Sequence, residues 1–165
     1  MLECASSRGL GECERSACSD DLVENSITVR DATPADILST IGIDPLAEHG
    51  DATRSDSIHR YVETGKTRVA EMNAAVVGYC VVDRSFFGHE FVVLLTVDER
   101  VRRHGVGAAL LRDAEHRWAT TKLFTSTNLS NHAMQSLLFS LGWQSAGIVY
   151  GLDEGDPELF FIAPR

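Results

Sequence analysis

Residues 102–107 read Arg-Arg-His-Gly-Val-Gly and separate two apolar segments of the chain. Before them lies Phe-Val-Val-Leu-Leu-Thr-Val at residues 91–97, an unbroken apolar run typical of a strand that is buried on both faces. After them begins a helical stripe formed by Leu110, Leu111, Ala114 and Trp118. The sequence therefore predicts a buried strand, a glycine turn and a helix that ends near Thr120.

The glycine turn has the properties of an anion-binding site. Gly105 and Gly107 carry no side chain, so an anion can approach their backbone closely. The first amide hydrogens of the helix are free at this point, and the helix dipole adds a partial positive charge. Arg102, Arg103 and His104 add charge-assisted hydrogen-bond donors. We therefore predict that a diphosphate group binds here.

Two widespread phosphate-binding motifs do not fit this segment. The dinucleotide-binding fingerprint requires Gly-x-Gly-x-x-Gly or Ala, whereas Leu110 stands at the third position. The P-loop requires Gly-Lys followed by Ser or Thr, which the segment lacks. A plain strand-to-helix turn with solvated arginines is the simpler alternative that the glycines alone leave open.

The rest of the chain predicts strands and helices in alternation. Strands are expected where β-branched and apolar residues gather, at residues 27–30, 67–72, 75–82, 89–97, 123–127, 148–152 and 159–163. Helices are expected after the start Thr33-Pro34-Ala35-Asp36, across residues 55–64 and after Asn131, with Gly65 and Gly142 as stops. Residues 83–88 and 153–157 are expected to form a loop and a turn. This order predicts an α+β fold, a sheet flanked by helices.

Composition limits the class of protein. With 165 residues and 44% hydrophobic content, the chain is long enough for one core. Residues 1–25 are polar and lack a hydrophobic period, so a flexible arm is expected before a domain at residues 26–165. The net charge of −9 disfavours nucleic acid and anionic membrane as partners and suits an amine. No apolar run approaches the roughly 20 residues of a membrane span, and the start lacks a secretory leader, so a cytoplasmic protein is expected.

Neither a disulfide framework nor a metal site is predicted. The cysteines, which form no Cys-x-x-Cys pair and are expected to be free thiols, are Cys4, Cys13, Cys18 and Cys80. The histidines outside the central region, which lack the spacing of metal ligands, are His49, His59, His116 and His132.

The pattern Arg102-x-x-Gly105-x-Gly107 after an apolar strand resembles the acyl-CoA-binding motif of the GNAT N-acetyltransferase superfamily, Gln/Arg-x-x-Gly-x-Gly/Ala. Asn131, followed by an apolar helix that closes in Leu-Gly-Trp at residues 141–143, is similar to that family's next segment. The expected order of elements also matches the family's fold, from about residue 27 to residue 162. The resemblance implies a mixed, mostly antiparallel sheet that is splayed between its fourth and fifth strands.

The resemblance also implies a cofactor and an activity. In such proteins the pantetheine arm of acetyl-CoA lies in the splay, bonded like an added strand. The cofactor-binding residues expected by carry-over are Leu95, Thr96, Val97, Arg102, Arg103, His104, Gly105, Val106, Gly107, Ala108 and Asn131. The implied activity is direct acetyl transfer from the thioester to a primary amine of a small molecule or protein. A noncatalytic acyl-CoA-binding or regulatory module is the alternative.

Acetyl transfer to an amine requires a base that removes a proton. Glu90, at the start of the central strand and near where the family often keeps a glutamate, is the first candidate, and His89 is the second. Neighbouring strand side chains point to opposite faces, so only one of the two can address the cleft directly. A strand amide near Val97 is expected to stabilise the oxyanion.

The family pattern places a tyrosine that protonates the departing thiolate where this chain has Leu138. Three readings follow: the thiolate leaves unprotonated or through water, Tyr150 replaces the tyrosine from another strand, or the chain binds acyl-CoA without efficient transfer. The acidic turn at residues 153–157 is either a solvated hairpin or an attractor of a cationic acceptor. His59 and Tyr61 are further candidates for contact with the acceptor. The acceptor's identity and the oligomeric state stay open, with a homodimer as one candidate.

Overall fold

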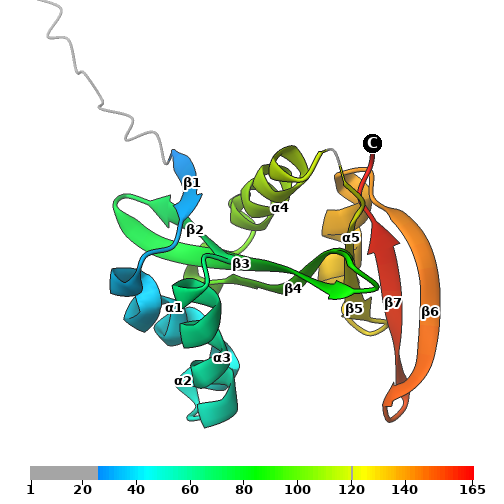
Figure 1. Cartoon of the computed structure of the whole chain (residues 1–165), viewed down its shortest axis with the longest axis horizontal. Coiled ribbons are helices and arrows are strands. Elements are labelled where there is room, and N and C mark those ends of the chain that lie inside the picture. Colours follow the sequence, from blue (N-terminus) through cyan, green and yellow to red (C-terminus); the bar gives the residue numbers. More distant parts are fainter. Residues whose placement is uncertain (1–25, 120) are drawn as a thin grey trace, which may run out of the picture.

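The chain folds around one seven-stranded mixed sheet with helices on both faces (Figure 1). The structure, a computed structural model, describes residues 26–119 and 121–165. The strand order is β1-β2-β3-β4-β5-β7-β6, and the neighbouring strands are antiparallel apart from the parallel pair β4 and β5. This confirms the predicted α+β class and the mostly antiparallel sheet.

The predicted order of elements is also confirmed. The strands are β1 Ile27–Asp31, β2 Thr67–Met72, β3 Ala75–Phe86, β4 His89–Val97, β5 Leu123–Asn128, β6 Gln144–Asp153 and β7 Asp156–Ile162. The helices are α1 Ile37–Ile43, α2 Pro45–Glu48, α3 Ala52–Glu63, α4 Val106–Arg117 and α5 His132–Ser140, with 3-10 turns η1 Pro34–Asp36 and η2 Glu99–Val101. The short helix α2 was not predicted.

Several boundaries differ from those predicted. β3 continues to Phe86, so residues 83–86 are strand rather than loop, because Phe87 and Gly88 supply the two positive φ angles of a tight hairpin turn. β7 begins at Asp156, which shortens the acidic turn, and β6 begins earlier than predicted, at Gln144. α4 ends at Arg117. Thr120, the expected helix end, lies outside the described residues, as do the expected arm at residues 1–25 and its cysteines Cys4, Cys13 and Cys18.

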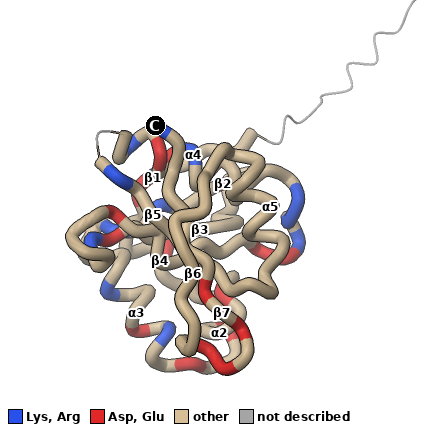
Figure 2. The backbone as a smooth tube through the Cα atoms, turned by 90° about the vertical axis from the view of Figure 1, so that its right-hand side faces the viewer, with Lys and Arg blue, Asp and Glu red and all other residues tan. Residues whose placement is uncertain are grey.

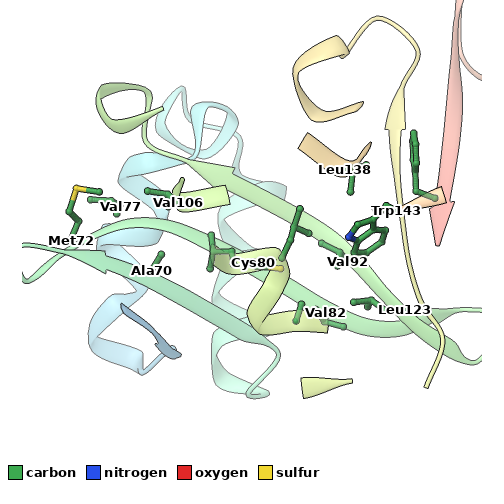
Figure 3. Packing of buried hydrophobic residues seen from close by; sticks show 14 residues of the cluster. Ala70, Met72, Val77, Cys80, Val82, Val92, Val106, Leu123, Leu138 and Trp143 are labelled. Atoms are coloured by element: carbon green, nitrogen blue, oxygen red, sulfur yellow. The ribbon is translucent and has the colours of Figure 1, made fainter. Parts of the chain in front are cut away.

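The sheet separates two hydrophobic clusters. The α4-side cluster packs under α4 and α5, and Figure 3 shows Cys80, Val92 and Leu138 among its side chains. The α3-side cluster packs under α1 and α3 and includes Tyr79 and Val81. Side chains alternate between the clusters along β3, as the period of a strand requires. No helix among the described residues has the length and apolar character needed to cross a membrane.

The strands β4 and β5 pair only at their beginnings. Their last paired residues are Val92 and Thr125, although β4 continues to Val97 and β5 to Asn128. Beyond that pair the two strands diverge, which leaves their facing backbone groups without a strand partner. The predicted splay between the fourth and fifth strands is therefore confirmed.

A β-bulge in β4 lies where the two strands separate. In the pairing with β3, Val81 lies opposite Leu94 and Val82 opposite Val92, so Val93 has no partner. Val93 and Leu94 consequently both pack against the α3-side cluster, whereas Val92 belongs to the α4-side cluster. A bulge bends its strand and increases the local twist. We infer that this extra residue turns β4 away from β5.

Ion pairs connect β1 with β2 and with the start of the first helix. The guanidinium of Arg30 donates to both carboxylate oxygens of Asp36 at 2.8 Å and, from Nε, to Glu71 at 3.0 Å. Asp36 is buried and also accepts from the backbone N–H of Thr33 at 2.7 Å, which confirms the predicted helix start. The Arg30 guanidinium, opposed by burial and assisted by Thr33, holds the pKa of Asp36 well below its usual range.

We expect Arg30→Met to lower the free energy of unfolding at pH 7 and to have a progressively smaller effect as the pH falls below about 4. Because the pKa of Asp36 is lower in the folded than in the unfolded chain, its contribution is complete above the unfolded-state pKa of about 3.9 and is lost as the pH falls below it. Urea unfolding of both proteins at pH 7, 4 and 3 measures this. Arg112→Met is the control, because Arg112 is exposed and forms no ion pair with another described residue. A deficit that stays constant with pH would contradict the prediction.

Candidate active site

A cavity of about 750 Å³ opens between the end of β4, the start of α4 and one face of α5. Its wall on β4 is formed by Leu95, Thr96 and Val97. The remaining lining residues come from α2, from the turn before α4, from α4 itself and from α5; they are Pro45, Arg102, Arg103, Gly105, Val106, Gly107, Ala108, Asn131, Ala133, Met134, Ser136, Leu137 and Ser140. The splay and the glycine turn thus contribute to one site.

The backbone of β4 turns unpaired groups toward this cavity. The N–H of Asp98 donates to the carbonyl of Val77 at 2.9 Å, which fixes the side of β4 that bonds to β3. Because bonding sides alternate along a strand, Thr96 also bonds toward β3, whereas the backbone groups of Leu95 and Val97 point toward the gap beside β5. A linear amide-containing ligand could therefore bond there like an additional strand.

The first turn of α4 turns free amides toward the same cavity. Gly105 is the residue before the helix and has φ +86°, a left-handed conformation that glycine adopts without strain. The first internal bond of the helix runs from the N–H of Ala109 to the carbonyl of Gly105 at 2.9 Å. The amides of Val106, Gly107 and Ala108 therefore have no acceptor within the helix. This arrangement is suited to binding an anion.

The charged residues of the turn differ in their positions. Arg102 and Arg103 both line the cavity, and Arg102 also forms a 3.0 Å ion pair with Glu99. Arg103 has φ 70°, a strained conformation for a residue other than glycine. His104 does not line the cavity; its Nδ1 lies 3.0 Å from the carbonyl oxygen of Arg102. All the predicted cofactor-binding residues except His104 are thus brought together.

Asn131 and residues of α5 form one wall of the cavity, and several of these residues were not predicted. Asn131 lines the cavity and also caps α5, since its Oδ1 accepts from the N–H of Met134 at 3.1 Å. Met134 and Leu137 pack against the α4-side cluster and also line the cavity. Ala133, Ser136 and Ser140 were missed. Their helical spacing was the available signal, but it does not distinguish a core face from a cavity face.

Neither Leu138, which stands where the family has a tyrosine, nor Tyr150, the predicted replacement for that tyrosine, lines the cavity. Leu138 is completely buried in the α4-side cluster (Figure 3) and is not a lining residue. Tyr150 lies in the edge strand β6 with 73% of its surface exposed and is not a lining residue either. The hydroxyl-bearing residues that do line the cavity are Thr96, Ser136 and Ser140.

The two candidate bases lie on opposite faces of β4. Glu90 is on the face of Val92, is nearly buried, and its Oε1 lies 3.2 Å from Nε of the exposed Arg84. His89 is on the other face, where its ring centroid lies 5.7 Å from that of Phe124 in β5. Neither residue lines the cavity. Within the described residues, no group of His, Cys, Asp and Glu is arranged to hold a metal ion.

Comparisons with known proteins agree with this architecture. An acetyltransferase of the GNAT family from Bacillus cereus ATCC 10987 is 30% identical, with a TM-score of 0.75 over 85% of this chain and 99% of that one. An N-acetyltransferase from Staphylococcus aureus Mu50 is 18% identical, with a TM-score of 0.68 over 83% of this chain and 97% of that one, and shares the fold.

A histone acetyltransferase HPA2 and related acetyltransferase from Corynebacterium glutamicum ATCC 13032 also shares the fold, at 21% identity and a TM-score of 0.68 over 85% of this chain and 97% of that one. No curated protein matches the sequence significantly. The family model described as Acetyltransferase (GNAT) domain matches residues 63–145, a segment that contains β4, the glycine turn, α4 and α5. This chain belongs to the GNAT family of acetyltransferases.

Proposed function

We propose that the protein is an acetyl-CoA-dependent N-acetyltransferase that transfers the acetyl group directly from the thioester to a primary amine of a small molecule or protein. The observation that carries this proposal is a single cavity lined by the free amides of α4 and by the unpaired strand edge of β4. The GNAT family generally uses acetyl-CoA. The donors present suit its two recognisable parts, a diphosphate and an amide-containing arm.

Each wall of the cavity has a binding role in this proposal. The amides of Val106, Gly107 and Ala108 hold the diphosphate, with Arg102 and Arg103 adding positive charge. The backbone of β4 at Leu95 and Val97 orients the pantetheine arm, and a strand amide there donates a hydrogen bond to the carbonyl oxygen. Bound acetyl-CoA supplies the activated thioester.

The acceptor amine must lose a proton before it attacks, and His89 is the base that we propose. His89 lies on the face of β4 opposite the α4-side cluster, which leaves it on the side that α4 and α5 do not cover. Glu90 lies on the covered face and is held by Arg84. Glu90 stays the alternative base, since a water molecule could relay the proton to it.

We expect His89→Gln to lower kcat/KM for the amine about 100-fold at pH 7, within the usual range for the loss of a general base. Glu90→Gln should change kcat/KM less than about threefold, because removing that charge disturbs only its pair with Arg84. Steady-state kinetics from pH 5.5 to 9 compares the two, and a larger loss in Glu90→Gln would identify Glu90 as the base.

The departing thiolate has no tyrosine donor in the cavity, because Leu138 occupies the corresponding position in the core. We propose that it leaves unprotonated or takes its proton from water. The same observation favours a second candidate function, a noncatalytic acyl-CoA-binding module, since the lining includes no Tyr, His, Cys, Asp or Glu. Mixing the protein with acetyl-CoA and a broad panel of amines while measuring free thiol separates the two. Coenzyme A binding without thiol release for any amine would support the second.

A further inference from the structure

Resting on this function, we propose that the acceptor is a primary amine attached to an aromatic or similarly flat apolar group, and that this group binds to a phenylalanine cluster on the sheet face opposite α4. The phenylalanine cluster consists of Phe86, Phe91, Phe124 and Phe160. It brings together the end of β3, the start of β4, and the strands β5 and β7.

The rings of the cluster contact one another around Phe86. The Phe86 ring centroid lies 5.1 Å from those of Phe91 and Phe124 and 5.3 Å from that of Phe160. Phe86 is nearly parallel to Phe160, with an interplanar angle of 21°. Phe87, at the tip of the same hairpin, is 89% exposed and contacts Phe86 edge-on. This is a concentrated aromatic surface at the end of a two-stranded hairpin.

The cluster lies outside both hydrophobic clusters of the domain. Along β5 and β7, Leu123 and Phe161 belong to the α4-side cluster, so the alternating neighbours Phe124 and Phe160 face the other way. None of the four rings is buried; each keeps part of its surface exposed. Figure 1 shows α1, α2 and α3 beside β3 and β4 rather than over β5, β7 and β6. The helices therefore leave this aromatic surface accessible.

The position of the cluster relates it to the reaction. Phe91 and Phe124 are register partners, and the pair that follows them, Val92 with Thr125, is the last before the strands separate. Because a strand rises about 3.3 Å per residue, the gap begins within roughly one or two residues of these rings. A ring bound on the cluster would thus project an amine on a chain of about two carbons toward the thioester, from the face opposite α4 and α5.

The charge beside the cluster complements an ammonium group. Residues 144–162 contain Asp153, Glu154, Asp156 and Glu158 but no Lys or Arg. Figure 2 shows acidic residues gathered at the end of the β6–β7 hairpin. Glu158 shares the strand face of Phe160 and forms no ion pair with another described residue. Acidic groups attract a cationic amine, and aromatic faces also favour it.

The test compares amines that differ in the ring and variants that differ in the cluster. For the wild-type protein, kcat/KM for 2-phenylethylamine should exceed that for n-butylamine and for spermidine at least about tenfold. Phe160→Leu, which keeps the volume of the side chain largely intact and lies outside the contact between Phe124 and His89, should lower the value for 2-phenylethylamine about 3- to 10-fold through KM. The values for n-butylamine and the affinity for coenzyme A should not change. Phe139→Leu, an exposed phenylalanine on α5, is the matched control.

Equal kcat/KM for the three amines, or equal losses for aromatic and aliphatic amines in Phe160→Leu, would overturn the inference. Light scattering would also overturn it if the wild type were a dimer and Phe160→Leu a monomer with unchanged amine preference. The cluster would then be covered by a second copy of the chain. If no amine releases thiol, the proposed transfer is wrong, but binding of the aromatic amine can still be measured separately. Saturation-transfer NMR of 2-phenylethylamine with the CoA-saturated protein should give a signal that Phe160→Leu removes, and its absence in the wild type would reject the aromatic site.

Discussion

Gly107→Val is expected to weaken coenzyme A binding at least about 100-fold, equivalent to roughly 2.7 kcal/mol. Gly107 lines the cavity in the first turn of α4, between two residues whose amides also lack a helical acceptor. A Cβ atom at this position would lie 3.1 Å from Cδ2 of Leu137 and 3.7 Å from Cγ2 of Val97. The branched side chain would therefore stand where, in the proposed function, the diphosphate approaches the backbone.

Isothermal titration with coenzyme A measures this effect, and Gly107→Ala should give an intermediate affinity because its single methyl group needs only a small shift of Leu137. Gly42→Val is the matched control: Gly42 is also helical and has no atom within 4 Å of an added Cβ. Thermal unfolding of the variants separates lost binding from lost folding. An affinity for coenzyme A that is unchanged in folded Gly107→Val would remove the role of the turn and, with it, the proposed enzyme.

The elements whose bounds depend on nearby residues were predicted from the sequence. β2 and β4 have the predicted bounds, because the apolar segment of each strand is limited by turn residues. α2 was missed although Asp44 and Pro45 are typical N-cap and first-turn residues, since a helix this short has almost no period to detect. The polar residues 83–85 indicated a loop, but pairing with β4 made them strand.

The site was predictable where a motif is local and unpredictable where it depends on register. The proposed diphosphate site at Gly105 and its neighbours uses the backbone of one turn, so sequence spacing suffices to locate it. His89 and Glu90 could be assigned to opposite faces, but not to a particular face. That assignment depends on the bulges in β3 and β4, and sequence gives no general signal for a bulge. The position of Tyr150 on an exposed edge strand is likewise a tertiary property.

A buried carboxylate holds α2 and α3 against the sheet beside the cavity. Asp44 has no exposed surface and accepts from Nε and Nη2 of Arg54, at 3.0 and 2.9 Å, and from the hydroxyl of Tyr79 at 2.5 Å. Its Oδ1 accepts from the N–H groups of Leu46 and Ala47 at 3.1 Å. Burial raises the pKa of Asp44, but the hydrogen bonds from Arg54, Tyr79 and the backbone hold this pKa below its usual range. An amide NH₂ in place of Oδ2 would leave Arg54 and Tyr79 without their acceptor, whereas an amide oxygen in place of Oδ1 would still accept from the backbone.

Asp44→Asn is expected to lower the free energy of unfolding by about 3 kcal/mol, as the loss of one partner from a buried ion pair does. Against a typical total of about 5–15 kcal/mol, this is a large fraction. The cost arises because Arg54 keeps a charge that is only 23% exposed and has lost its partner. Urea unfolding at pH 7 measures the change, and Asp51→Asn, at the exposed N-cap of α3, should cost less than about 0.5 kcal/mol, because Asn caps a helix about as well as Asp.

A second substitution distinguishes the orphaned charge from a general disruption of packing. In Asp44→Asn combined with Arg54→Leu, the unpaired guanidinium is absent, so much of the lost stability should return. Pro45 follows Asp44 in the chain, the hydroxyl of Thr96 donates to the Asp44 carboxylate, and both residues line the cavity. Coenzyme A should therefore stabilise the single variant less than the wild type at equal concentration. If the double variant is less stable than Asp44→Asn alone, then Arg54 contributes mainly through its packing, and the carboxylate is not the centre of this network.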